Sequence, residues 1–89
     1  MMAAAITVHL RYFASLREAL GPGGPVPAPQ GTTVAQLRRL LQAQDEAHAR
    51  ALADDRLLRC AVDQGLCVDV HQVLGDGAEV AFFPPVTGG

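Results

Sequence analysis

The run of residues 79–89, EVAFFPPVTGG, constrains the fold more than any other part of the chain. Val80 and Phe82 alternate with an alanine and with Phe83, which is the period of a strand whose two faces meet different surroundings. We therefore expect Val80 and Phe82 to face a core and Phe83 to face away from it. The two prolines that follow have no N–H to donate, so the strand should end there.

Residues 84–89 are expected to form an extended tail beyond this strand. Pro84 and Pro85 favour polyproline geometry, and the six residues 84–89 reach at most about 20 Å when extended. Gly88 and Gly89 carry no side chain, so the end of the tail could pass through a narrow channel in a partner. A terminal carboxylate is a poor acyl donor at neutral pH, so chemistry at Gly89 would need activation, for instance as an acyl-adenylate. The alternative is a frayed end without a role.

Length and composition fit one small domain, residues 1–89. The chain has 49% hydrophobic and 18% charged residues, which is enough for a single modest core. Its net charge of -2 and its 4% aromatic content do not suit a nucleic-acid-binding surface. No apolar run approaches the roughly 20 residues that span a bilayer, and residues 1–5 lack the charged and long apolar regions of a signal peptide. We expect a cytoplasmic protein that binds neither nucleic acid nor a membrane. The chain also contains no lysine, which excludes an internal isopeptide acceptor.

The two cysteines, Cys60 and Cys67, are interpreted as small apolar side chains. Their spacing matches neither a redox Cys-x-x-Cys nor a paired zinc knuckle, and the cytoplasm keeps thiols reduced. Cys67, Asp69 and His71 would share one strand face, but three alternating residues without a fourth partner are weak evidence for a metal site. We therefore expect the chain itself to bind neither a metal nor a cofactor.

Apolar periodicity predicts the elements of the N-terminal half. A first strand is expected where Ile6, Val8, Leu10 and Tyr12 alternate with Thr7, His9, Arg11 and Phe13. A short helix over 14–20 should end at Gly21. The proline-rich segment 21–31 predicts a surface connection with at most a short edge strand over 26–28.

The main helix is predicted to begin after Thr33, because Thr33 followed by Gln36 is the signature of a capping box. Its apolar stripe is expected to hold Val34, Leu37, Leu40 and Leu41. Its solvated side is expected to hold Arg38, Arg39, Gln42 and Gln44. A second helical piece over 45–52 should carry a Glu46–Arg50 charge pair and an exposed His48.

The remaining segments are predicted to be strands joined by turns. Asp54 and Asp55 indicate a turn in preference to an acid/base pair. One strand is expected over 57–64, and a second where Leu66, Val68 and Val70 alternate. A tight turn over 75–77 leads into the last strand. A few strands with a helix across one face make an α+β arrangement.

The segment 81–89, AFFPPVTGG, resembles the C-terminus of the small subunits of molybdopterin synthase, a family of ubiquitin-like sulfur carriers. The resemblance continues upstream through 76–80, 61–64, 57–58 and 13–18, and so covers most of the chain. It implies a ubiquitin-like β-grasp fold with a mixed sheet, a main helix packed on one face and a C-terminal Gly-Gly tail.

The same resemblance implies a role for the end of the tail. An ATP-dependent, ubiquitin-activating-like adenylyltransferase would adenylate the Gly89 carboxylate, and a sulfur donor protein would convert it to a thiocarboxylate. The thiocarboxylate would donate sulfur to cyclic pyranopterin monophosphate and build the dithiolene of molybdopterin. Gly88 would act as the spacer. Acid/base groups would lie mainly on the large subunit, so this chain alone would have no turnover.

The family's partner-facing apolar positions fall on Leu66 and Phe83, and Arg17 is a further interface candidate. The tail residues expected to enter the large subunit are Pro84, Pro85, Val86 and Thr87. Three alternatives remain open: a carrier of the same fold for thiamine synthesis or tRNA thiolation, a protein modifier attached through Gly89, and a β-grasp module with an inert tail.

Overall fold

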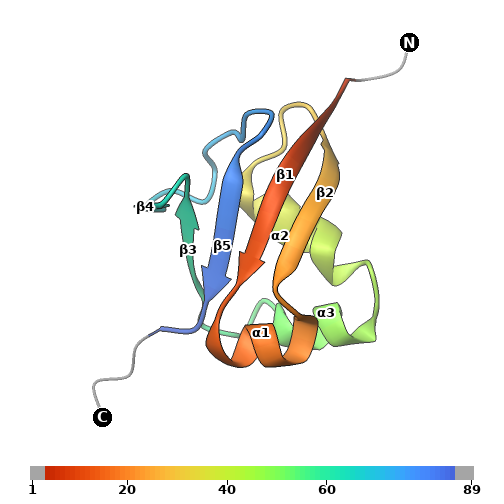
Figure 1. Cartoon of the computed structure of the whole chain (residues 1–89), viewed down its shortest axis with the longest axis vertical. Coiled ribbons are helices and arrows are strands. Elements are labelled where there is room, and N and C mark those ends of the chain that lie inside the picture. The colour runs from red at the N-terminus through yellow and green to blue at the C-terminus, as the bar shows by residue number, and fades with distance from the viewer. Residues whose placement is uncertain (1–3, 86–89) are drawn as a thin grey trace.

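Five strands form one mixed sheet in the computed structural model of the chain, which describes residues 4–85 (Figure 1). The strands are β1 (Ala5–Tyr12), β2 (Gly23–Pro29), β3 (Arg59–Val62), β4 (Gly65–Leu66) and β5 (Glu79–Phe83), and the helices are α1 (Ala14–Leu20), α2 (Val34–Gln42) and α3 (Glu46–Ala51). The strand order is β2-β1-β5-β3-β4, with β1 and β5 parallel and the other neighbours antiparallel. The helices leave one face of the sheet open (Figure 1). This arrangement confirms the α+β prediction.

The core lies between the sheet and α2, and the predicted periodicity explains it. Every second residue of β1 is buried, as the alternation predicted. Val8, Leu37 and Val80 meet there with no exposed surface, and Phe82 is 3% exposed. Burial of such side chains stabilises a fold by about 1.5–3 kcal/mol each. Leu40 is the exception: it is 41% exposed, because the buried stripe of α2 is narrower than predicted.

The capping box at the start of α2 is confirmed. The Gln36 N–H donates to Thr33 Oγ1 at 3.2 Å, and the Thr33 N–H donates to Gln36 Oε1 at 3.0 Å. The predicted short helix and its stop are also confirmed, since α1 ends at Gly21 with a φ of 84°. The turn into the last strand is held by Asp76, whose carboxylate accepts the Thr7 N–H at 2.8 Å.

The prediction for the proline-rich segment was wrong in extent, since β2 is a seven-residue strand that pairs along β1. Two hydrogen bonds lie at the ends of this pairing, from the Tyr12 N–H to Pro22 O and from the Gln30 N–H to Ala4 O. They show which of the alternating residue pairs between β1 and β2 are hydrogen-bonded. The prolines of β2 fall in the pairs that are not hydrogen-bonded, so their backbone nitrogens point away from β1, toward the outer edge of the sheet. They therefore cost the ladder no hydrogen bond, which is how edge strands tolerate proline.

Two further predictions of solvated side chains were wrong. Arg38 is half-buried and donates to the carbonyls of Leu52 at 2.8 Å, of Arg56 at 3.1 Å and of Ala53. It thereby holds the turn after α3 against α2. His48 is only 17% exposed in its side chain, because its ring packs edge-on against Tyr12 at 6.3 Å between centroids. The predicted pairing of the acidic and basic residues on α3 is confirmed, at 2.6 Å.

The strand predicted through Val68 and Val70 is absent from the described residues, where β4 ends at Leu66. Val68 is 91% exposed. Here the chain leaves the sheet and runs to the start of α2, where the Ala35 N–H donates to Val70 O at 2.9 Å. The first N–H groups of a helix have no partner inside the helix, so this loop satisfies one of them.

Candidate functional site

The candidate site begins where β5, which lies between β1 and β3, leaves the sheet. Phe82 fills the core and Phe83 lies on the opposite face, as predicted. Pro84 and Pro85 follow outside any strand and are half-buried. The predicted tail residues Val86, Thr87, Gly88 and Gly89 lie outside the described residues.

The sheet face that the helices leave uncovered, called the open face below, is built by cross-strand pairs. Ala81 pairs with Arg11 of β1 on one side and with Ala61 of β3 on the other. Ala61 in turn pairs with Leu66 of β4, so these residues form one row across four strands. Phe83 belongs to the next row, where it pairs with Arg59.

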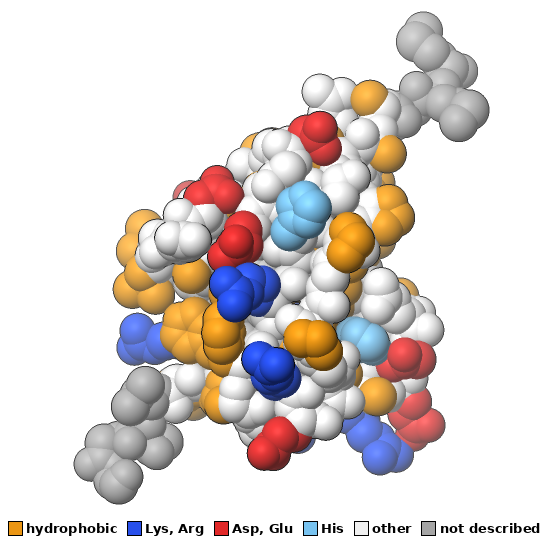
Figure 2. Space-filling model, viewed as in Figure 1, with side chains coloured by type: hydrophobic (Ala, Val, Ile, Leu, Met, Phe, Trp, Pro, Cys, Tyr) orange, Lys and Arg blue, Asp and Glu red, His pale blue; other side chains and the backbone are white. Residues whose placement is uncertain are grey.

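Three large apolar side chains surround the two alanines of the open face. Phe13, directly after β1, is 38% exposed, Leu66 is 56% exposed and Phe83 is half-buried. Hydrophobic side chains gather over this end of the sheet in Figure 2, beside the point where the chain leaves β5. Exposed aromatic side chains around a flat floor of small residues are typical of a protein interface.

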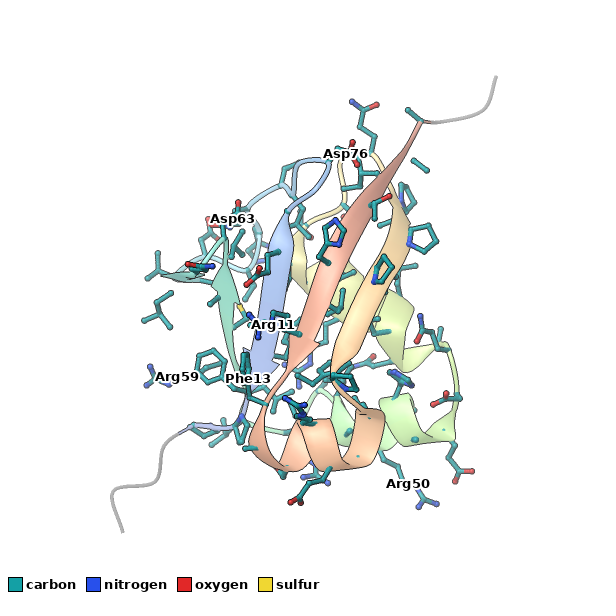
Figure 3. The ribbon with its side chains drawn as sticks, viewed as in Figure 1. Arg11, Phe13, Arg50, Arg59, Asp63 and Asp76 are labelled. Carbon is teal, nitrogen blue, oxygen red and sulfur yellow. The ribbon has the colours of Figure 1, made fainter. Side chains whose placement is uncertain are left out.

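Charged side chains border this apolar cluster. The Arg11 guanidinium lies 5.3 Å from the centre of the Phe13 ring, and its Nη1 is 3.7 Å from Glu79 Oε1. Arg59 lies at the outer side of the same end of the sheet, as Figure 3 shows. Arg11 is half exposed, so its ion pair contributes little to stability and remains available to a partner.

Within residues 4–85, no three His, Cys, Asp or Glu side chains are grouped as a metal site requires. A hollow of about 200 Å³ lies on the helix side of the sheet, lined in part by Val34, Leu58 and Phe82, away from the open face. The exposed apolar side chains of the open face are of the kind that protein interfaces use.

The structure brings Leu66 and Phe83 onto one face of the sheet, and it adds residues that sequence reasoning missed. Phe13 is the main one. Its signal was present in the sequence, since it is an aromatic residue at the end of the polar side of the first strand. Arg17 is exposed on α1, one helical turn after Phe13.

Comparison with known proteins identifies the family. Residues 10–89 match the ThiS family. The molybdopterin synthase sulfur carrier subunit of Escherichia coli is 45% identical over 82 residues, which are 92% of this chain and 99% of that protein. The chain belongs to this family of sulfur carriers. The corresponding subunit of Mycobacterium tuberculosis is 37% identical over 86 residues, covering 94% and 99% of the two chains.

Solved structures agree on the sulfur carrier fold. The HVO 2177 protein of Haloferax volcanii superposes with a TM-score of 0.80 at 28% identity, covering 96% of this chain and 88% of its own. SAMP1 of Haloferax volcanii gives 0.72 at 26% identity, with 93% and 99% covered. A chain in the complex of subunits 1 and 2 of molybdopterin-converting factor from Helicobacter pylori gives 0.64 at 23% identity, with 94% and 100% covered. These likenesses confirm the β-grasp fold.

In the part of the chain that the structure describes, no helix is long and apolar enough to span a bilayer.

Proposed function

We propose that this chain is the sulfur-carrying subunit of a molybdopterin synthase and that Gly89 bears the sulfur. The observation that carries the proposal is the near full-length likeness to sulfur carrier subunits of molybdopterin synthase. The geometry supports it, because two prolines follow β5 directly where the strand ends beside the open face. The carrier works in the cytoplasm and needs neither a nucleic acid nor a membrane as partner.

The chemistry follows from the low reactivity of a carboxylate. An adenylyltransferase related to ubiquitin-activating enzymes uses ATP to convert the Gly89 carboxylate to an acyl-adenylate, with release of pyrophosphate. The terminal sulfur of a persulfide on a sulfur donor protein then attacks the carbonyl and AMP leaves. A thiol reduces the resulting acyl disulfide, which frees the thiocarboxylate and forms a disulfide on the donor side. Two thiocarboxylates in turn each transfer one sulfur to cyclic pyranopterin monophosphate, which becomes molybdopterin, and water returns each carrier to its carboxylate. The carrier binds no cofactor of its own, and ATP is used by the activating enzyme.

The large catalytic subunit of the synthase is the partner that receives the tail. Its docking surface on the carrier is the open face, with Phe13, Leu66 and Phe83 as apolar anchors and Arg11 at the border. Pro84, Pro85, Val86 and Thr87 would lie along a channel of the large subunit. Gly88 allows the narrowest part of that channel to close around the chain. Arg17 contacts the partner at the margin.

The test is the intact mass of the chain after incubation with ATP, its activating enzyme and a sulfur source. We expect a gain equal to the exchange of one oxygen for sulfur, which peptide mass spectrometry assigns to Gly89. A variant that lacks Gly89 is the matched control and should stay unchanged. An unchanged mass of the full chain, with an enzyme that loads a control carrier, would contradict the proposal.

A second candidate function is conjugation to other proteins, which the likeness to SAMP1, a small archaeal modifier protein, favours. The chain would then be joined through Gly89 to lysines of its targets. Tryptic peptides of cellular proteins in which a lysine carries residues 60–89 of this chain would support that function, since Arg59 is the last site at which trypsin cleaves the chain. Their absence in cells that accumulate the thiocarboxylate would leave sulfur transfer as the function.

A further inference from the structure

Cys60 and Cys67 face each other across the hairpin of β3 and β4. The register of this pair matches Val62 with Gly65 and Ala61 with Leu66. One step further along the same register, Cys60 is opposite Cys67, and the Cys67 N–H donates to Cys60 O at 2.9 Å. The two cysteines are therefore cross-strand neighbours, although six residues separate them in the sequence.

The turn of this hairpin fixes the register. Asp63 and Gln64 form a two-residue connection with φ values of 50° and 70°, the pattern of a type I′ turn. Asp63 is also tied to the central strand, because its N–H donates to Glu79 O at 2.8 Å and its carboxylate accepts the Glu79 N–H at 3.0 Å. A slip of the hairpin would break these bonds, so the two cysteines stay opposite each other.

Both thiols lie on the same side of the hairpin. Cys60 is 7% exposed and belongs to the core, and Cys67 is half-buried and packs against that core. Hydrogen-bonded antiparallel pairs have Cα atoms about 5.5 Å apart, within the range of about 4.4–6.8 Å that disulfides bridge. Burial, together with the neighbouring Cys67 thiol, raises the pKa of Cys60 to about 12. Cys60 is therefore a poor first nucleophile, and Cys67 is the thiol that a solvent oxidant reaches first.

We propose that Cys60 and Cys67 are a redox modification site that closes to an intramolecular disulfide when the protein meets hydrogen peroxide. The Cys67 sulfur attacks the peroxide, the O–O bond breaks, and a sulfenic acid and water are formed. The Cys60 sulfur then attacks the Cys67 sulfur, the S–O bond breaks, and the hydroxide leaves as water with the Cys60 proton. Two thiols lose two electrons, and one peroxide becomes two waters.

The position of this bond has a consequence for the hairpin that carries Leu66. β4 has only two residues, and Leu66 directly precedes Cys67. A disulfide would clip the end of β4 to β3 on the core side, while Leu66 remains on the open face. The bond should therefore protect both sulfurs from further oxidation without covering the surface proposed for the large subunit; this last point rests on the proposed function.

The test uses the full chain alone, so its result does not depend on the sulfur carrier proposal. After treatment with an equimolar amount of hydrogen peroxide, we expect a monomer that has lost the mass of two hydrogen atoms. It should resist iodoacetamide, and dithiothreitol should restore both free thiols. The Cys67→Ala variant, which keeps the buried Cys60, should lose no hydrogen under the same treatment.

Three results would overturn the proposal. They are a disulfide-linked dimer, a Cys67 that proceeds to sulfinic acid while Cys60 is still present, and a treated chain in which iodoacetamide modifies both thiols. The Cys60→Ala variant gives a second measurement. Without its resolving partner, Cys67 should accumulate sulfenic or sulfinic acid, and equal oxidation of Cys67 in the variant and the natural chain would contradict pairing.

Discussion

Phe83 is the residue that connects the fold to the proposed docking. It lies on the open face directly before Pro84, while the neighbouring Phe82 fills the core. We predict that Phe83→Ala weakens binding of the large subunit by about 30-fold, equivalent to about 2 kcal/mol, because a buried aromatic anchor is lost. Titration calorimetry measures the affinity, and circular dichroism should show an unchanged fold.

A matched control for Phe83 exists on the helix side of the molecule. Leu40 is 41% exposed on α2, away from the open face, so Leu40→Ala should leave the affinity unchanged. Equal affinities of the Phe83→Ala variant and the natural chain would remove Phe83 from the interface.

Tyr12 gives a pH dependence that follows from its surroundings. Burial, and to a lesser degree the charge of Asp45, raises its pKa from 10.0 to about 12. The unfolded chain loses this proton near pH 10 while the folded chain keeps it, so stability should fall between pH 10 and about pH 12. It is the only tyrosine of the chain, so tyrosinate absorbance reports this group alone. Titration at the ordinary value in the folded protein would contradict the prediction, and Tyr12→Phe should remove the signal.

At the residue scale, the sequence was sufficient where a side chain's role depends on periodicity alone. The alternation along β1 correctly predicted that Ile6 and Val8 are buried. The two phenylalanines of β5 lie on opposite faces of the sheet, as expected. The roles of Arg38 and His48 could not be predicted, because each contacts residues brought near only by the path of the chain around α3. Phe13 was missed as a site residue because its neighbour across the sheet is not visible in sequence.

At the element scale, the start of α2 tests how much a capping box contributes to stability. Thr33→Ala removes the side chain that accepts the Gln36 N–H and should lower the free energy of unfolding by about 1 kcal/mol. Thr33→Ser keeps the hydroxyl and is the matched control. Urea denaturation measures both variants. Equal stability of the alanine and serine variants would show that the capping box contributes nothing here.

The elements that sequence reasoning missed share one cause. β2 was underestimated because prolines usually end strands, and only the phase of the ladder with β1 shows that their nitrogens face outward. The segment after Leu66 was predicted as a strand because its valines alternate. Its backbone instead bonds to the first turn of α2, far away in sequence. Pairing between distant segments decided both cases.

At the scale of the whole molecule, the tail and the fold should be separable. The last strand ends at Phe83, so changes at Gly88 or beyond Gly89 lie outside the sheet. We predict that Gly88→Val, or one extra residue after Gly89, abolishes sulfur loading and leaves the unfolding midpoint unchanged. Intact mass and thermal denaturation measure the two effects. One extra residue at the N-terminus is the control and should load normally. Normal loading of either tail variant would refute the tail mechanism.

The central position of β5 also determines when the chain can fold during its synthesis. The pairs β1–β2 and β3–β4 are translated first, but no strand joins the two pairs into one sheet until residues 79–83 are available. Val80 and Phe82 are almost completely buried, so a chain that stops before β5 lacks the middle of its core. Such long-range pairing is slow and comes late in folding. Truncated translation products that lack the tail therefore also lack a completed domain, because the strand that completes the domain leads directly into the tail.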